Sequence, residues 1–201
     1  MANTNRTSGF TPVKSTTGAP WNGQANVYSI AASYGTALYV GDPVISSGTA
    51  DVNGVPGIAL AAATGGVRGV IVGLGKYEGL IANPSNLDLT YRPASDPAVW
   101  YALVADDPQL IFEVTEESNG TALAATEVGL NTISLLAAGN GYVSGWAVRS
   151  TTGATAATTA TLQLKLLGLA RKPNNAFGAY ARWLVMFNVH ELGHGTGSLG
   201  V

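Results

Sequence analysis

The sequence has no cysteine and little charge, and both absences narrow what the protein can be. Among its 201 residues there is no cysteine, which excludes disulfide bonds and thiolate metal ligands. Only 11% of the residues are charged, against roughly 25% in an average globular protein. A surface with so little charge has to be covered by small polar residues or by other chains, and such a composition suits a protein that assembles.

Basic residues are also scarce. Ten Lys and Arg stand against twelve Asp and Glu, which gives a formal net charge of −2 and leaves no basic stripe. Binding of nucleic acid through its phosphates needs such a stripe, so we predict no nucleic-acid partner. No apolar run approaches the roughly 20 residues that cross a bilayer, and the polar first residues do not resemble a secretory signal. We therefore predict no membrane association.

Short apolar runs separated by turn residues indicate a mainly β fold. The runs are rich in β-branched and aromatic residues, and Asn-Gly, Gly and Pro interrupt them. We predict an antiparallel β-sandwich or a β-barrel-like body with few short helices. The predicted strands cover 25–30, 36–40, 44–45, 66–75, 100–105, 110–114, 161–167 and 183–189.

Three local features are also predicted from the pattern. The turn sequence Asp106-Asp107-Pro108 separates the strands 100–105 and 110–114, which are expected to pair as a hairpin. The best candidate for a helix is short and covers 123–130. The Thr-, Ala- and Gly-rich stretch 144–160 is expected to be a surface loop.

The first 24 residues differ in composition from the rest and are predicted to form an extended N-terminal arm, followed by a single β-rich domain over 25–201. The arm is polar apart from isolated apolar residues, among them Phe10, Val13 and Trp21. Such a segment is either a frayed terminus or an arm that orders on a partner, with Phe10 and Trp21 as anchors. Removal of residues 1–24 is expected to leave the β body folded.

One motif points toward chemistry. His190, Glu191 and His194 fit the pattern H-E-x-x-H, in which two histidines on one helical face bind zinc and the glutamate acts as general base. The surrounding glycines disfavour a helix, and the preceding run reads as a strand. In a strand, residues four apart lie roughly 13 Å from each other, too far to share one zinc ion. We predict no metal site, no catalytic residue and no cofactor; a zinc peptidase remains an alternative.

Several stretches together carry a resemblance to a known family. They are Met1–Arg6, Gly9–Val13, Gly18–Gln24, Gly41–Val44, Asp106–Pro108, Ala124–Asn131, Thr159–Leu169 and Arg182–Val185. In their order along the chain they resemble the capsid decoration, or cement, proteins of tailed bacteriophages. The resemblance implies a structural, non-enzymatic protein on the outer surface of the virion. Its partners would be the major capsid protein and copies of itself, in a trimer.

The resemblance also implies that a terminal arm grips the shell. Phe10, Val13 and Trp21 would then fill pockets on the capsid, while Arg6 and Lys14 would pair with its acidic groups. Other β-type virion components remain as alternatives, such as a tail tube, baseplate or head fibre protein. A carbohydrate-binding sandwich is suggested only by the Trp and Tyr content, since the sequence does not arrange these residues as a platform.

Overall fold

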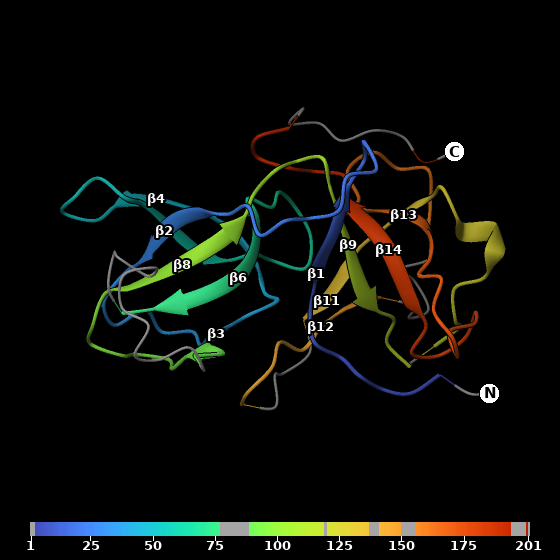
Figure 1. The fold of residues 1–201 in the computed structure, drawn as a ribbon, viewed down its shortest axis with the longest axis horizontal. Coiled ribbons are helices and arrows are strands. Elements are labelled where there is room, and N and C mark those ends of the chain that lie inside the picture. Colours follow the sequence, from blue (N-terminus) through green and yellow to red (C-terminus); the bar gives the residue numbers. More distant parts are fainter. Residues whose placement is uncertain are drawn as a thin grey trace.

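The computed structural model describes residues 3–76, 89–118, 120–136, 141–149, 156–193 and 200. The chain is mainly β, with 42% strand and 2% helix, which confirms the predicted fold class of a β body with few helices. Two groups of strands lie next to each other along the long axis of the molecule (Figure 1). In the described part of the chain, no helix has the length and apolar character needed to span a membrane.

The first group is a closed barrel. Five strands close it in the order β2-β5-β4-β6-β8, with one parallel pairing between β2 and β5 and antiparallel pairings elsewhere. Its own apolar core contains Tyr28, Ile30, Val44, Ile71 and Trp100, all nearly inaccessible to solvent. The strands are β2 (Asn26–Ile30), β4 (Pro43–Ala50), β5 (Pro56–Leu60), β6 (Gly69–Gly75) and β8 (Trp100–Ala105).

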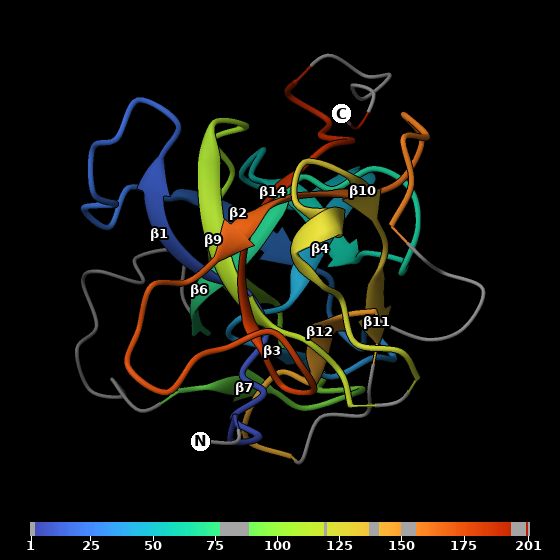
Figure 2. The ribbon, with the colours of Figure 1, turned by 90° about the vertical axis from the view of Figure 1, so that its right-hand side faces the viewer.

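The second group is an open antiparallel sheet of five strands in the order β1-β9-β14-β13-β10. Figure 2 views the molecule from the side of this sheet. Along β14, Trp183, Val185 and Phe187 are buried and alternate with half-buried residues on the outer face, as expected for a strand covered on one side. The strands are β1 (Thr11–Ser15), β9 (Leu110–Thr115), β10 (Asn131–Thr132), β13 (Leu164–Leu169) and β14 (Arg182–Phe187).

The sheet and the barrel share one apolar core. Phe112 and Phe187 from the sheet pack with Phe10, and their ring centroids lie 5.2 to 6.4 Å apart. Val67 and Val70, which belong to the barrel side of the molecule, are part of the same cluster. Burial of apolar side chains is the main favourable term in folding, so this cluster binds the two groups of strands together.

Short elements complete the fold. β3 (Leu38–Tyr39) pairs with β7 (Tyr91–Arg92), and β11 (Ser134–Leu136) pairs with β12 (Trp146–Val148). The 3₁₀ helix η2 (Ala125–Glu127) lies within the range 123–130 predicted to be helical, so the prediction has the place right but the element is shorter than expected. Glu127 accepts a hydrogen bond from the Ala124 amide, a capping contact that favours this short turn over extended chain.

Two predictions about pairing and loops are wrong. β8 and β9 do not form a hairpin, because β8 pairs with β2 and β6 while β9 pairs with β1 and β14. The chain crosses from barrel to sheet at Asp106, whose carboxylate accepts hydrogen bonds from Asn26 and Tyr28 of the barrel. The stretch 144–160 is not only loop, since its described part contains the fully buried strand β12; residues 150–155 lie outside the described residues.

Candidate functional site

The N-terminal segment contacts the body at several points along its described length. Asn3 exchanges hydrogen bonds with the backbone of Ala176, and the Thr115 hydroxyl donates to the Arg6 carbonyl. Beyond these contacts, β1 is a full strand of the sheet and pairs with β9. The division into a separate arm over 1–24 and a body therefore differs from the structure, in which residues of this segment complete the sheet.

Phe10 is the clearest correction among the predicted site residues. Its side chain is only 1% exposed and packs between Phe112 and Phe187, so it serves the core of this chain and cannot fill a pocket on a partner. The sequence around an isolated aromatic residue in a polar segment does not tell whether the side chain packs in the core of its own chain or binds a partner. Removing residues 1–24 would take Phe10 and β1 away, so we no longer expect the remaining body to stay intact.

The other four predicted residues lie nearer the surface. Trp21 is half-buried against the shared core, and its indole N–H donates to the Gln24 carbonyl at 3.1 Å. Arg6 is exposed and Lys14 is half-buried, while Val13 is 37% exposed. Of these four residues, Val13 lines the pocket described next, whereas Arg6, Lys14 and Trp21 are not among its lining residues.

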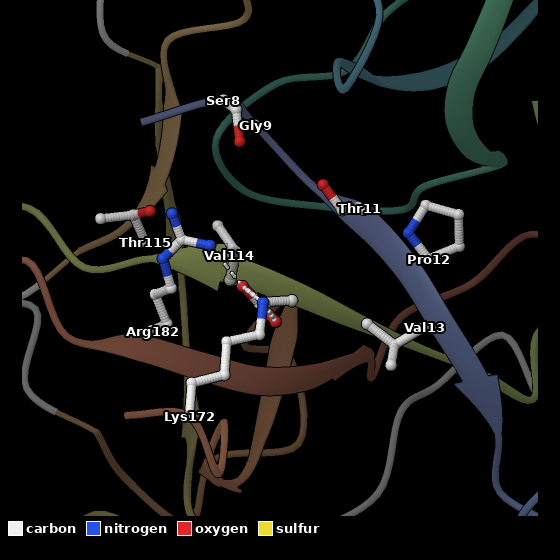
Figure 3. Close-up of a pocket in the computed structure, with 10 residues that line it drawn as sticks. Ser8, Gly9, Thr11, Pro12, Val13, Val114, Thr115, Lys172 and Arg182 are labelled. Atoms are coloured by element: carbon white, nitrogen blue, oxygen red, sulfur yellow. Dashed lines mark hydrogen bonds and ion pairs between the residues drawn. The ribbon is translucent and has the colours of Figure 1, made fainter. Parts of the chain in front are cut away.

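This pocket lies on the outer side of the sheet and has a volume of about 380 Å³ (Figure 3). One wall is the N-terminal segment, and the others come from β9, from the start of β14 and from the loop before it. Its lining mixes hydroxyl, apolar and charged groups: Ser8, Gly9, Thr11, Pro12, Val13, Glu113, Val114, Thr115, Lys172 and Arg182.

Three charged side chains meet in this pocket. Glu113 accepts from Lys172 Nζ and from an Arg182 guanidinium nitrogen, each at 2.7 Å. Burial alone would raise the pKa of Glu113, but the hydrogen bonds and charges of Lys172 and Arg182 outweigh it and lower the pKa. Two cations thus share one carboxylate, and the cluster keeps one net positive charge beside apolar walls.

The local sequence explains how these groups meet. Arg182 begins β14, where residues facing away from the core alternate with Trp183 and Val185, and Glu113 faces the same side of the neighbouring strand β9. Asn175 holds the two ends of the loop that carries Lys172, because its side chain is hydrogen-bonded to the backbone of Ala170 and Arg182. The alternation in β14 predicts that Arg182 points outward, but its pairing with Glu113 depends on long-range sheet register.

The H-E-x-x-H segment is not helical where it is described. His190 is buried, and its Nδ1 accepts a hydrogen bond from the Leu192 amide at 3.1 Å. Glu191 accepts from the Ser46 amide and hydroxyl and lies 3.9 Å from the Arg68 guanidinium. Burial lowers the pKa of His190 in spite of the opposing charge of Asp106. His194 lies outside the described residues, and within the described ones no three His, Cys, Asp or Glu side chains are placed to hold a metal ion.

A partly buried polar network lies beside these residues. The Tyr28 hydroxyl donates to Asp106 at 2.5 Å and accepts from Arg68 at 2.8 Å. Burial, together with the bond to Asp106, raises the pKa of Tyr28 to about 12. Because Arg68 also lies beside Glu191, the network links the barrel to the segment after β14. Its groups bond one another, which is how buried polar side chains stabilise a fold.

Comparison with protein-family models, with curated protein sequences and with solved structures finds no match.

Proposed function

We propose that the chain is a structural virion protein that binds the outside of a phage capsid and stabilises the assembled shell. The resemblance along the chain and the low charge support this proposal. The single observation that carries it is the pocket between β1 and β14. There, the N-terminal segment, which the resemblance assigns to capsid contact, joins Lys172 and Arg182 at the surface.

In this proposal the pocket receives an acidic side chain of the major capsid protein. Glu113 balances one of the two cations, so an incoming carboxylate would meet one net positive charge. Val13 and Pro12 would pack against the aliphatic part of the same side chain. This assignment replaces Phe10 and retains Val13 among the proposed contact residues. Copies of the chain, as a trimer, would clamp neighbouring capsid subunits and gain from multivalency.

The physical basis of stabilisation is linkage. A protein that binds the assembled shell but not its dissociated subunits stabilises the shell by mass action. Electron cryomicroscopy of virions assembled with and without the chain, followed over a heat ramp, tests this. Density at symmetry-related positions on the outer shell, with rupture at lower temperature in its absence, is the expected result. Density only in the tail would instead favour the tail-tube alternative.

The pocket itself is tested by Lys172→Ala, which leaves the Arg182–Glu113 pair in place. We expect capsid affinity to fall about tenfold, because charged contacts that are partly desolvated are worth roughly 1–3 kcal/mol. Arg171→Ala is the matched control, since Arg171 is an exposed neighbouring cation that does not line the pocket. Equal binding by both variants in a sedimentation assay with shells would argue against the pocket as the contact site.

A further inference from the structure

Three tyrosines from distant parts of the sequence meet on the barrel side of the molecule. Tyr39 in β3 and Tyr91 in β7 are cross-strand partners, and their rings stack with centroids 5.8 Å apart and planes 19° apart. Tyr142 stands nearly perpendicular to Tyr91, at 6.3 Å and 80°. Tyr142 is 70% exposed, while Tyr39 and Tyr91 are half-buried. We call these three residues the tyrosine cluster.

A buried arginine holds the strands beneath the cluster. Arg92, next to Tyr91, is fully buried and lies over the ring of Tyr34. Its guanidinium donates to backbone carbonyls of the segments that precede β3 and follow β7, and these bonds tie the two segments together at one end of the strand pair. The acceptors are the carbonyls of Ala31, Tyr34, Thr36, Pro93 and Asp96.

A buried carboxyl joins the segments that carry the rings. Asp42 accepts a hydrogen bond from the Tyr39 amide at 2.8 Å and is also hydrogen-bonded to the Ser144 hydroxyl. Ser144 follows Tyr142 by two residues and is itself buried. The third ring is therefore held beside the other two by a contact under the surface. Rigid rings lose little conformational entropy when a ligand binds, so less of the binding free energy is spent on ordering the site.

The chemistry of the cluster favours a neutral, hydroxylated ligand. Its side chains bring no formal charge, so they offer no countercharge to an anion. The parallel stack of Tyr39 and Tyr91 leaves no slot between the rings for a proline, and the two rings do not enclose a cation. The negative face of an exposed phenol ring attracts the weakly positive C–H groups of a pyranose, and phenol hydroxyls exchange hydrogen bonds with sugar hydroxyls.

We propose that the tyrosine cluster is a binding site for a neutral saccharide, with one sugar ring stacked on Tyr142 and its hydroxyls directed to the phenols beside it. The site lies on residues that do not line the pocket between β1 and β14, so it is independent of the capsid contact proposed above. The sequence alone did not arrange its aromatic residues as a binding platform, whereas the fold brings these three tyrosines together.

The test is binding of the full-length protein to a printed array of neutral glycans, followed by saturation-transfer NMR with the best-bound oligosaccharide. We expect saturation at the sugar C–H protons and about a tenfold loss of affinity in Tyr142→Ala, since aromatic residues in binding sites are frequent hot spots. Tyr142→Phe keeps the stacking surface and should lose less. Phe177→Ala removes an aromatic residue that is 46% exposed outside the cluster, and it should bind as the parent does.

Three results would overturn the proposal. The first is that no neutral glycan binds the parent protein more tightly than it binds the Tyr142→Ala variant. A second is saturable binding of tetramethylammonium that Tyr142→Ala removes, in the absence of sugar binding, which would identify the cluster as a cation site. The third is self-association in analytical ultracentrifugation that Tyr142→Ala abolishes, which would make the cluster a contact between copies.

Discussion

At the scale of single residues, Asp42 carries the clearest physical consequence. The residue is only 3% exposed, and burial raises the pKa of its carboxyl to about 6, against the lowering effect of the Ser144 hydroxyl and the Tyr39 amide. In the unfolded chain the carboxyl titrates near pH 4. Between these values the folded state binds a proton that the unfolded state lacks, so the free energy of unfolding falls as the pH rises, and it levels off above pH 6.

We therefore expect Asp42→Asn to be more stable than the parent protein above pH 6. The amide keeps an acceptor for Tyr39 and a donor for Ser144 but carries no charge, which removes a cost of up to about 3 kcal/mol for roughly two pKa units. Urea unfolding of both proteins at intervals from pH 4 to pH 8 measures the difference. It should be small at pH 4 and grow up to pH 6; a difference that does not depend on pH would contradict the assignment.

At the scale of elements, the N-terminal segment shows what sequence patterns can and cannot predict. The strands with clear alternation, such as β13 and β14, lie close to their predicted ranges because alternation reflects local burial. β1 has no such pattern, and Pro12 within it reads as a break, yet it pairs with β9 across about 100 residues of sequence. Its place is decided by Phe10 entering a core that distant strands build.

The same limit applies to the candidate site. The outward direction of Arg182 follows from alternation in β14, but its meeting with Glu113 and Lys172 requires the register of three segments. Likewise, no local signal brings Tyr39, Tyr91 and Tyr142 together. The hairpin prediction at Asp106 was wrong for a related reason. Turn residues predict a change of direction, whereas pairing depends on which apolar core each strand joins.

The close crossing before β1 gives a prediction at this scale. Gly9 has φ +70°, and a Cβ there would overlap the Ser144 side chain and the Gly41 carbonyl. Gly9→Ala should therefore destabilise the fold through both backbone strain and steric overlap. Gly23→Ala is the matched control, because Gly23 has φ +91° but no atom within 4 Å of its added Cβ. Gly23→Ala should lose only about 1 kcal/mol of stability, because backbone strain is its only cost.

Chemical denaturation of the two glycine variants measures the comparison. The cost for Gly9→Ala is expected to exceed that for Gly23→Ala by at least about 1 kcal/mol, a typical penalty for overpacking a filled site. Equal losses would mean that residues 8–10 do not cross Gly41 and Ser144 as closely as described.

At the scale of the whole molecule, the shared core makes the barrel and the sheet one cooperative unit. Val67, Val70 and Ala105 from the barrel side lie in the same apolar cluster as Phe112, Val185 and Phe187 of the sheet. Separating the two groups would expose this surface to water at roughly 25 cal/mol per Å² of apolar area. Neither group is therefore expected to remain folded after the other has unfolded.

Hydrogen exchange along a urea series tests this cooperativity. The amides of β6 and β8 in the barrel, and those of β9 and β14 in the sheet, should lose protection with the same midpoint and denaturant dependence. Protection that persists in the barrel strands after the sheet strands have exchanged would show two separate folding units. In that contradicting case, near-ultraviolet circular dichroism, which reports on the buried tryptophans of both groups, would show two transitions instead of one.

The closure of the barrel has a further consequence for a chain with so little charge. Charge repulsion cannot keep crowded copies apart, and open strand edges would then invite amyloid-like stacking. The barrel has no such edge, and the outer edge of β1 is occupied by the returning chain, where Lys14 bridges to Pro20 and the Trp21 amide bonds the Val13 carbonyl. At the other edge, Asn131 of β10 is bridged by Ala157. Among the described strands, the barrel and the five-stranded sheet would accordingly offer copies held at high local density little open edge for fibrillar stacking.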